Sequence, residues 1–193
     1  MSSRELAVPA FAVLLAACGN VAAARDVQCG AQPVQVLPNG SFDAAMPAWM
    51  QDPPTTALIC GMPTIMPFDG TQAGCLGGVD SKVQTLTQQV PLPEGGKSVK
   101  LSGQICITTA ETMQVDHDTL AFDLLDGATT IAAIGKSTNR QGAANCQFAP
   151  FELTAPLTAD PVTATLQIRS TLDANMPTSF YLDALSLTVS CTP

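Results

Sequence analysis

The chain has 193 residues, of which 12% are charged, and its formal net charge at pH 7 is −8. Eight Lys and Arg residues are too few for the clustered basic surface that drives binding to phosphate backbones, which argues against nucleic acid as a partner. The length suffices for one domain with a sizeable core, and nothing in the composition marks a second one.

Residues 1–17 predict a cleaved signal peptide. Arg4 precedes an apolar run, Leu6 to Ala17, that is too short to span a bilayer. The stretch LAACG at the end of this run resembles the lipobox of bacterial lipoproteins, whose cysteine is acylated on sulfur and becomes the new N-terminus. The resemblance makes Cys18 the expected lipid attachment site, at the start of a tether over residues 18–33.

Two locations remain open for the exported chain. Asn20, which is not Asp, follows the lipobox glycine, and in the usual sorting pattern of lipoproteins this implies an anchor in the bacterial outer membrane. Each buried methylene group contributes about 0.8 kcal/mol, so several acyl chains would hold the protein on the membrane permanently. Cleavage after Ala24 would instead discard Cys18 and leave a secreted or periplasmic protein that begins at Arg25.

The remaining cysteines predict three disulfides. Both cleavages remove Cys18 from the count and leave an even set: Cys29, Cys60, Cys75, Cys106, Cys146 and Cys191. No CxxC motif or Cys/His spacing typical of zinc occurs among them, so disulfides are favoured over a metal site or a redox dithiol. We expect Cys29 to pair with Cys191, because they bracket the folded part, and Cys106 to pair with Cys146.

Alternating apolar and polar residues, which are typical of strands, begin at residues 34–36. The segment MPAWMQDPPTTALICGMPTIMPFDG (46–70) contains five prolines. Because proline is confined to the edges and turns of sheets, this segment predicts a long loop with one short strand at 57–59. From Lys82 onward, alternating apolar and polar residues predict strand after strand, most clearly over residues 99–108, 120–124 and 164–169.

The last predicted strand changes its inward face part-way along. Phe180 and Leu182 share one parity, whereas Leu185 and the apolar residues after it share the other. A slip of one residue predicts a β-bulge at Asp183 and Ala184. The period-two patterns and the Pro/Gly turns together predict an all-β fold, a two-sheet antiparallel sandwich.

Five motifs occur in the order found in galactose-binding-like jelly-roll domains: NGSFD, CLGGVDS, LTQQVPLP, HDTLAFDLLD and TSFYLDALSLTV. They cover roughly residues 36–190. The chain resembles the accessory β-sandwich modules of secreted bacterial proteases and glycosidases. The resemblance implies a single jelly-roll domain over residues 34–193, which the disulfides would brace.

The resemblance also implies a structural calcium ion. In that superfamily the ion is often held by the acidic residue after the aromatic of the first motif and by the aspartate of the last strand. Those positions are Asp43 and Asp183 here, with backbone carbonyls expected from residues 69–74. Calcium takes about six to eight oxygen ligands, of which this set supplies a good share. Alternatively, Asp43 caps a turn and Asp183 hydrogen-bonds across the bulge.

The chain departs from the carbohydrate-binding branch because it has one Trp and one Tyr. Trp49 lies in the Pro-rich loop and is expected to anchor it more than to contact sugar, while Tyr181 is expected to face outward. The loop, with Trp49, Met50, Met62 and Met66, offers an adaptable apolar surface for a ligand. The leading hypothesis is therefore protein interaction or adhesion at the bacterial surface, with polysaccharide binding as the alternative.

No catalytic residue can be named, and a small exported hydrolase is a distant third hypothesis. His117 is the only histidine of the chain, and its Asp-His-Asp triplet would suit a general base or a metal site. No companion is evident in the sequence, so we expect His117 in a loop before a strand, with its carboxylate neighbours solvated. Neither a GxSxG nor an HExxH motif occurs.

Overall fold

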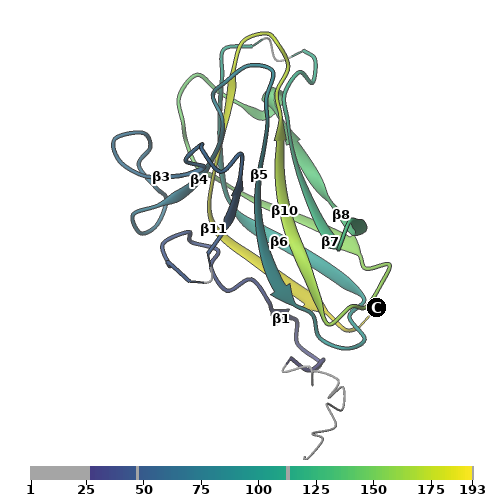
Figure 1. Cartoon of the computed structure of the whole chain (residues 1–193). Helices are drawn as coiled ribbons and strands as arrows, with labels where there is room; N and C mark the ends of the chain where they lie inside the picture. The colour runs from purple at the N-terminus through teal and green to yellow at the C-terminus, as the bar shows by residue number, and fades with distance from the viewer. Residues whose placement is uncertain (1–26, 47, 112–113, 193) are drawn as a thin grey trace, which may run out of the picture.

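The computed structural model describes residues 27–46, 48–111 and 114–192 (Figure 1). The described chain forms a sandwich of two antiparallel sheets, and its helical structure is limited to one 3-10 turn, η1 (Asn139–Gln141). This confirms the predicted all-β jelly-roll sandwich. The expected signal peptide, Cys18 and the first part of the tether lie outside the described residues.

The first sheet has the strand order β3-β4-β11-β6-β9, and β1 also pairs with β11. Its strands are β1 (Val34–Gln35), β3 (Ile59–Cys60), β4 (Ala73–Gly77), β6 (Ser98–Thr109), β9 (Ala149–Pro156) and β11 (Thr178–Ser190). The second sheet has the order β2-β5-β10-β7-β8. Its strands are β2 (Met50–Asp52), β5 (Val83–Pro91), β7 (Thr119–Asp126), β8 (Thr129–Thr138) and β10 (Thr163–Thr171).

Alternation of side chains builds the core between the sheets. In β10, Ala164, Leu166 and Ile168 are buried, whereas the Thr, Gln and Arg residues that follow each of them face outward. Burying one large apolar side chain stabilises the fold by about 1.5–3 kcal/mol. The largest fully buried side chains come from both sheets and their connections: Phe42, Phe122, Phe180, Leu58, Leu76, Leu86, Leu92, Leu101, Leu120, Leu124, Ile131 and Leu166.

The predicted bulge in β11 is confirmed. The pairing of β11 with β6 shifts register between Asp183 and Ser186, and Ala184 has a φ of 49°. The N–H of Leu185 donates a 2.9 Å hydrogen bond to the carbonyl of Gly40. A Cβ atom at residue 40 would collide with the Leu185 carbonyl, so the glycine of the NGSFD motif lets the chain pack against the bulge.

The Pro-rich segment holds two short strands where one was expected. β2 pairs with the edge of β5, and β3 pairs with β4. The predicted strand at 57–59 is displaced toward the C-terminus, because Ile59 and Cys60 are the residues that pair with β4. Strands of two or three residues carry no detectable period, which is why their bounds did not follow from the sequence.

Three disulfides brace the sandwich and confirm the predicted pairing. Cys29 joins Cys191, Cys106 joins Cys146, and the remaining pair is Cys60 and Cys75. Such a set is typical of extracytoplasmic proteins. Within the described part of the chain, no helix has the length and apolar character needed to cross a membrane.

Candidate functional site

Asp43, the first predicted calcium ligand, caps the loop before β4. Its Oδ1 atom accepts hydrogen bonds from the N–H of Thr71 (2.8 Å), the hydroxyl of Thr71 (2.9 Å) and the N–H of Gln72 (3.0 Å). The bond from the Thr71 N–H is the main cause that lowers the pKa of Asp43. Gly70, with a φ of 61°, lets the loop close over this carboxylate, which a side chain there would strike.

Asp183, the second predicted ligand, reaches the same loop from the bulge of β11. It is fully buried, its Oδ2 accepts the N–H of Asp69 (2.9 Å), and its Oδ1 accepts the N–H of Ala184 (2.7 Å). Burial raises the pKa of Asp183, and the nearby charge of Asp43 raises it further. The corner thus brings together two carboxylates whose repulsion a cation would relieve.

The contacts of this corner differ from the expected calcium shell in one respect. The loop around residues 69–72 presents N–H groups to both carboxylates, where carbonyl ligands were expected. These bonds match the alternative of a turn cap and a bonded bulge. The charge of the corner therefore suits Ca²⁺, while the calcium ion itself stays a prediction.

Two methionines of the predicted ligand loop line a hollow of about 580 Å³. Met62 and Met66 are 73% and 77% exposed, and β3, Gly61, Pro67 and residues 70–72 form the rest of the lining. We call this site the Met-lined hollow. Met50, the third predicted methionine, is also exposed but lies in β2, in the other sheet.

Trp49 does not belong to a ligand surface, which corrects its inclusion in the predicted ligand loop. Its side chain is 4% exposed and stacks on Phe42, with 5.1 Å between the ring centroids. Its Nε1 atom donates a 2.8 Å hydrogen bond to the carbonyl of Asn39. The indole therefore anchors the loop to the first motif, and the outward orientation expected of Tyr181 agrees with its half-buried state between two buried neighbours.

A further hollow, of about 410 Å³, lies between β6, the end of β8 and residues 141–151, and was missed in the sequence. Three amide side chains line it, from Gln141, Asn145 and Gln147, together with the rings of Phe148 and Phe151. None of the described residues that line it carries an ionisable side chain. We call it the amide-lined hollow; the run NCQFAPF, dense in amides and aromatics, is the signal that could have indicated it.

Two contacts hold the wall of the amide-lined hollow in place. The Cys106–Cys146 disulfide ties this wall to β6. The ring of Phe148 meets that of Phe68 edge-on, with 6.0 Å between the centroids. The wall is therefore braced on both sides of residue 147.

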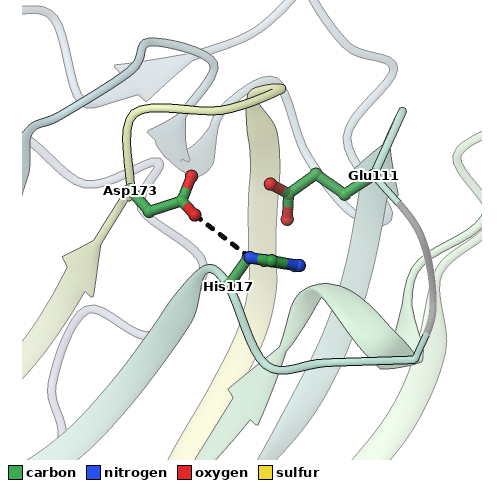
Figure 2. A group of neighbouring side chains, drawn as sticks. All are labelled: Glu111, His117 and Asp173. Atoms are coloured by element: carbon green, nitrogen blue, oxygen red, sulfur yellow. Dashed lines mark hydrogen bonds and ion pairs between the residues drawn. The ribbon is translucent and has the colours of Figure 1, made fainter.

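His117 lies before β7 as predicted, but its surroundings differ from the prediction. Asp118 is 1% exposed and not solvated, whereas Asp116 is partly exposed and lies within ion-pair distance of two basic side chains. The fold also supplies the companions that the sequence did not reveal, Glu111 and Asp173 (Figure 2). Glu111 lies earlier in the same β6–β7 connection and Asp173 in the β10–β11 connection, so no contiguous motif indicates the group.

Comparison with known proteins establishes the fold. No protein-family model and no curated protein matches the chain. The K3 cleaved adhesin domain of Lys-gingipain from Porphyromonas gingivalis W83 is 13% identical, with a TM-score of 0.53, and the match covers 81% of this chain and 99% of that domain. An arabinose-bound GH51 α-L-arabinofuranosidase is also 13% identical at a TM-score of 0.53, with coverage of 80% of this chain and 26% of the enzyme.

A third similar structure is the carbohydrate-binding module TmCBM61 in complex with β-1,4-galactotriose. It is 15% identical, with a TM-score of 0.48, and the match covers 80% of this chain and 97% of the module. At 13% identity, the likenesses to the adhesin domain and the arabinofuranosidase show a shared fold.

Proposed function

We propose that the chain is a non-catalytic binding module whose ligand is a neutral polysaccharide, bound in the amide-lined hollow. The lining of that hollow carries the proposal. Amide side chains donate to and accept from hydroxyl groups, and aromatic rings cover the apolar faces of sugars. Charged ligands would find no counter-charge among the described residues of the lining, and acid–base catalysis would find no titratable group there.

The choice of polysaccharide over protein reverses the order of the two hypotheses from the sequence. The arabinofuranosidase that shares the fold is described as arabinose-bound, which supports a sugar as ligand class. The gingipain domain is described as an adhesin domain, so the same fold also serves adhesion. Because a fold alone does not decide function, the proposal rests on the chemistry of the hollow.

Binding is expected to depend on one ring and one amide of the hollow. Phe148→Ala should lower the affinity for the recognised polysaccharide more than tenfold, because it removes the exposed edge of the apolar platform. Gln147→Ala should lower it about threefold to tenfold, the worth of one neutral hydrogen bond. Both are measured as lost retardation in native gels cast with a panel of neutral polysaccharides.

Val83→Ala is the control, because Val83 is an exposed apolar side chain of β5 and does not line the hollow. It should keep the parent's retardation within about twofold, the scatter of mutants outside a binding hot spot. Equal migration of parent and variants on every polymer would contradict the proposed function.

Protein binding is the second candidate, and the Met-lined hollow favours it. Flexible, polarisable methionines are used at adaptable binding surfaces, and Met62 and Met66 are among the most exposed large apolar side chains described. A Met62→Lys/Met66→Lys variant should then lose cross-linking to a purified envelope protein while keeping its retardation by polysaccharide. A variant that still cross-links to the envelope protein would leave the Met-lined hollow without a binding role.

We propose that the corner of Asp43 and Asp183 binds a structural Ca²⁺ ion. Cations bind ionised carboxylates, so the increase in melting temperature caused by Ca²⁺ should be largest near pH 7 and disappear as the pH falls through the raised pKa of Asp183. In excess chelator, stability changes with pH in the opposite direction. The raised pKa of Asp183 contributes stability below about pH 4, and this contribution is lost as the pH rises through that pKa. Thermal melts across this range check both trends.

The control for the calcium prediction is Asp43→Asn, which should abolish the response to Ca²⁺. A parent protein whose melting temperature ignores Ca²⁺ at pH 7 would leave the turn-cap alternative in place.

We propose that Cys18 is acylated and anchors the module in the outer membrane. Metabolic labelling with palmitate in a bacterial host should mark the parent chain and not a Cys18→Ser variant. Fractionation should then place the parent in the membrane and the variant in the soluble fraction. Absence of label from both chains would favour the secreted alternative, and equal labelling of both would show that the acyl chain is not on Cys18.

A further inference from the structure

Three side chains from two connections, β6–β7 and β10–β11, meet beside one another in Figure 2. Glu111 follows β6, His117 precedes β7, and Asp173 follows β10. Their potential ligand atoms all lie within 4.8 Å of one another, and His117 Nδ1 lies 3.1 Å from Asp173 Oδ2. Ligands about 2.0–2.2 Å from a single ion would need only a small contraction of this cluster.

Two carboxylates at this place have buried oxygens without a partner. Both oxygens of Glu111 are shielded from solvent, and no described residue donates a hydrogen bond to them. Asp118 is 1% exposed; its Oδ1 accepts the N–H of Asp173 (2.8 Å), but its Oδ2 is also buried and accepts no bond from the described residues. Buried carboxylate oxygens are normally paired, so these atoms point to a positively charged ligand.

The charges of the cluster point the same way. Burial raises the pKa of Glu111, and the negative charge of Asp118 raises it further, while His117 opposes the shift. Asp173 and Asp80 also raise the pKa of Glu111. A divalent cation would offset this repulsion and favour the ionised carboxylates.

The backbone around the cluster is held by a buried amide. Asn139 Oδ1 accepts the N–H of His117 (2.9 Å) and of Asp118 (3.3 Å), and its Nδ2 donates to the carbonyl of Val115 (3.0 Å). On the other side, the N–H of Glu111 donates to the hydroxyl of Thr109 at 3.1 Å. The backbone at His117 and Glu111 is therefore fixed by hydrogen bonds, which limits the movement of the two side chains.

We propose that Glu111, His117 and Asp173 form a binding site for a divalent transition-metal cation of the Zn²⁺ type. An imidazole nitrogen favours Zn²⁺ and similar ions, whereas Ca²⁺ and Mg²⁺ take oxygen ligands. A hollow of about 250 Å³, lined by Glu111, His117, Asn175 and Met176, gives the cation access from solvent. The site is separate from the corner of Asp43 and Asp183 and independent of polysaccharide binding.

The test is calorimetric titration of the full chain with ZnCl₂, after metal removal and with its disulfides intact. Cys18→Ser serves as the parent background, so that its thiol cannot compete for zinc. We expect one Zn²⁺ ion per chain and at least a tenfold loss of affinity in both His117→Ala and Glu111→Gln. His117 is the only histidine, so its imidazole proton NMR signals must shift with Zn²⁺ and stay unchanged with Ca²⁺.

Asp116→Asn is the matched control. Asp116 adjoins His117 in sequence, but its carboxylate lies 3.7 Å from Lys136 and 3.9 Å from Arg140, outside the cluster. This variant should keep the parent's Zn²⁺ affinity.

Equal loss in Asp116→Asn would show diffuse attraction to acidic residues and overturn the site. So would equal Zn²⁺ affinity in the parent, His117→Ala and Glu111→Gln, or imidazole signals that ignore Zn²⁺. Circular dichroism without metal checks that each variant folds. If a variant does not fold, the response of the His117 imidazole signals to Zn²⁺ in the parent still decides.

Discussion

Replacing Cys29 and Cys191 with serine is expected to lower the free energy of unfolding by about 2–5 kcal/mol. The bond joins residues 162 positions apart, so it closes nearly the whole described chain into one loop. Cross-linking removes conformational freedom from the unfolded chain, and the effect grows with loop length. Urea unfolding of the parent and the double variant measures the difference.

The short disulfide is the comparison for this experiment. Cys60 and Cys75 are 15 positions apart, so their replacement should cost about 3 kcal/mol, toward the lower part of the same range. If removal of the long bond costs no more than removal of the short one, the loop-entropy explanation fails.

Asp183→Ala is expected to destabilise the protein by about 2–6 kcal/mol. The substitution leaves the N–H groups of Asp69 and Ala184 without their acceptors, at a cost of about 1–3 kcal/mol each. It also releases the contact between the bulge of β11 and the loop before β4. Denaturant unfolding in excess chelator measures this effect without any contribution from bound cations.

Two further variants serve as controls. One removes the charge of residue 183 but keeps an oxygen acceptor, and the other removes the neighbouring carboxylate of the same corner. Asp183→Asn keeps one oxygen acceptor but turns an amide NH₂ toward the other N–H, so it should fall between the parent and Asp183→Ala. Asp43→Ala removes an exposed carboxylate and should cost about 1 kcal/mol or less. A loss below about 0.5 kcal/mol in Asp183→Ala would mean that the two N–H groups find other acceptors.

The long strands and the bulge could be predicted because their pattern is local. Alternation in β5, β10 and β11 repeats over enough residues to identify an inward face, and the parity change at Asp183 marks the bulge directly. β2 and β3 could not be placed in the same way. Their two or three residues pair only because the Pro-rich segment returns to the edges of β5 and β4.

The candidate sites show the same difference between local patterns and long-range contacts. The meeting of Asp43 with Asp183 followed from the ordered motifs, whereas the partners of His117 did not. Glu111 and Asp173 reach His117 only after β6, β7 and β10 have taken their places in different sheets. The burial of Asp118 was equally invisible, because the N–H of Asp173 that it accepts also comes from a distant connection.

The Cys29–Cys191 bond also decides how the domain responds to mechanical load. A pulling force applied between the chain before Cys29 and the chain after Cys191 passes through two sulfur atoms and bypasses the eleven strands of the described chain. No hydrogen bond of either sheet carries tension on that route, so the sandwich cannot be drawn out from its ends. A force deforms the sandwich only where it acts on the chain between Cys29 and Cys191.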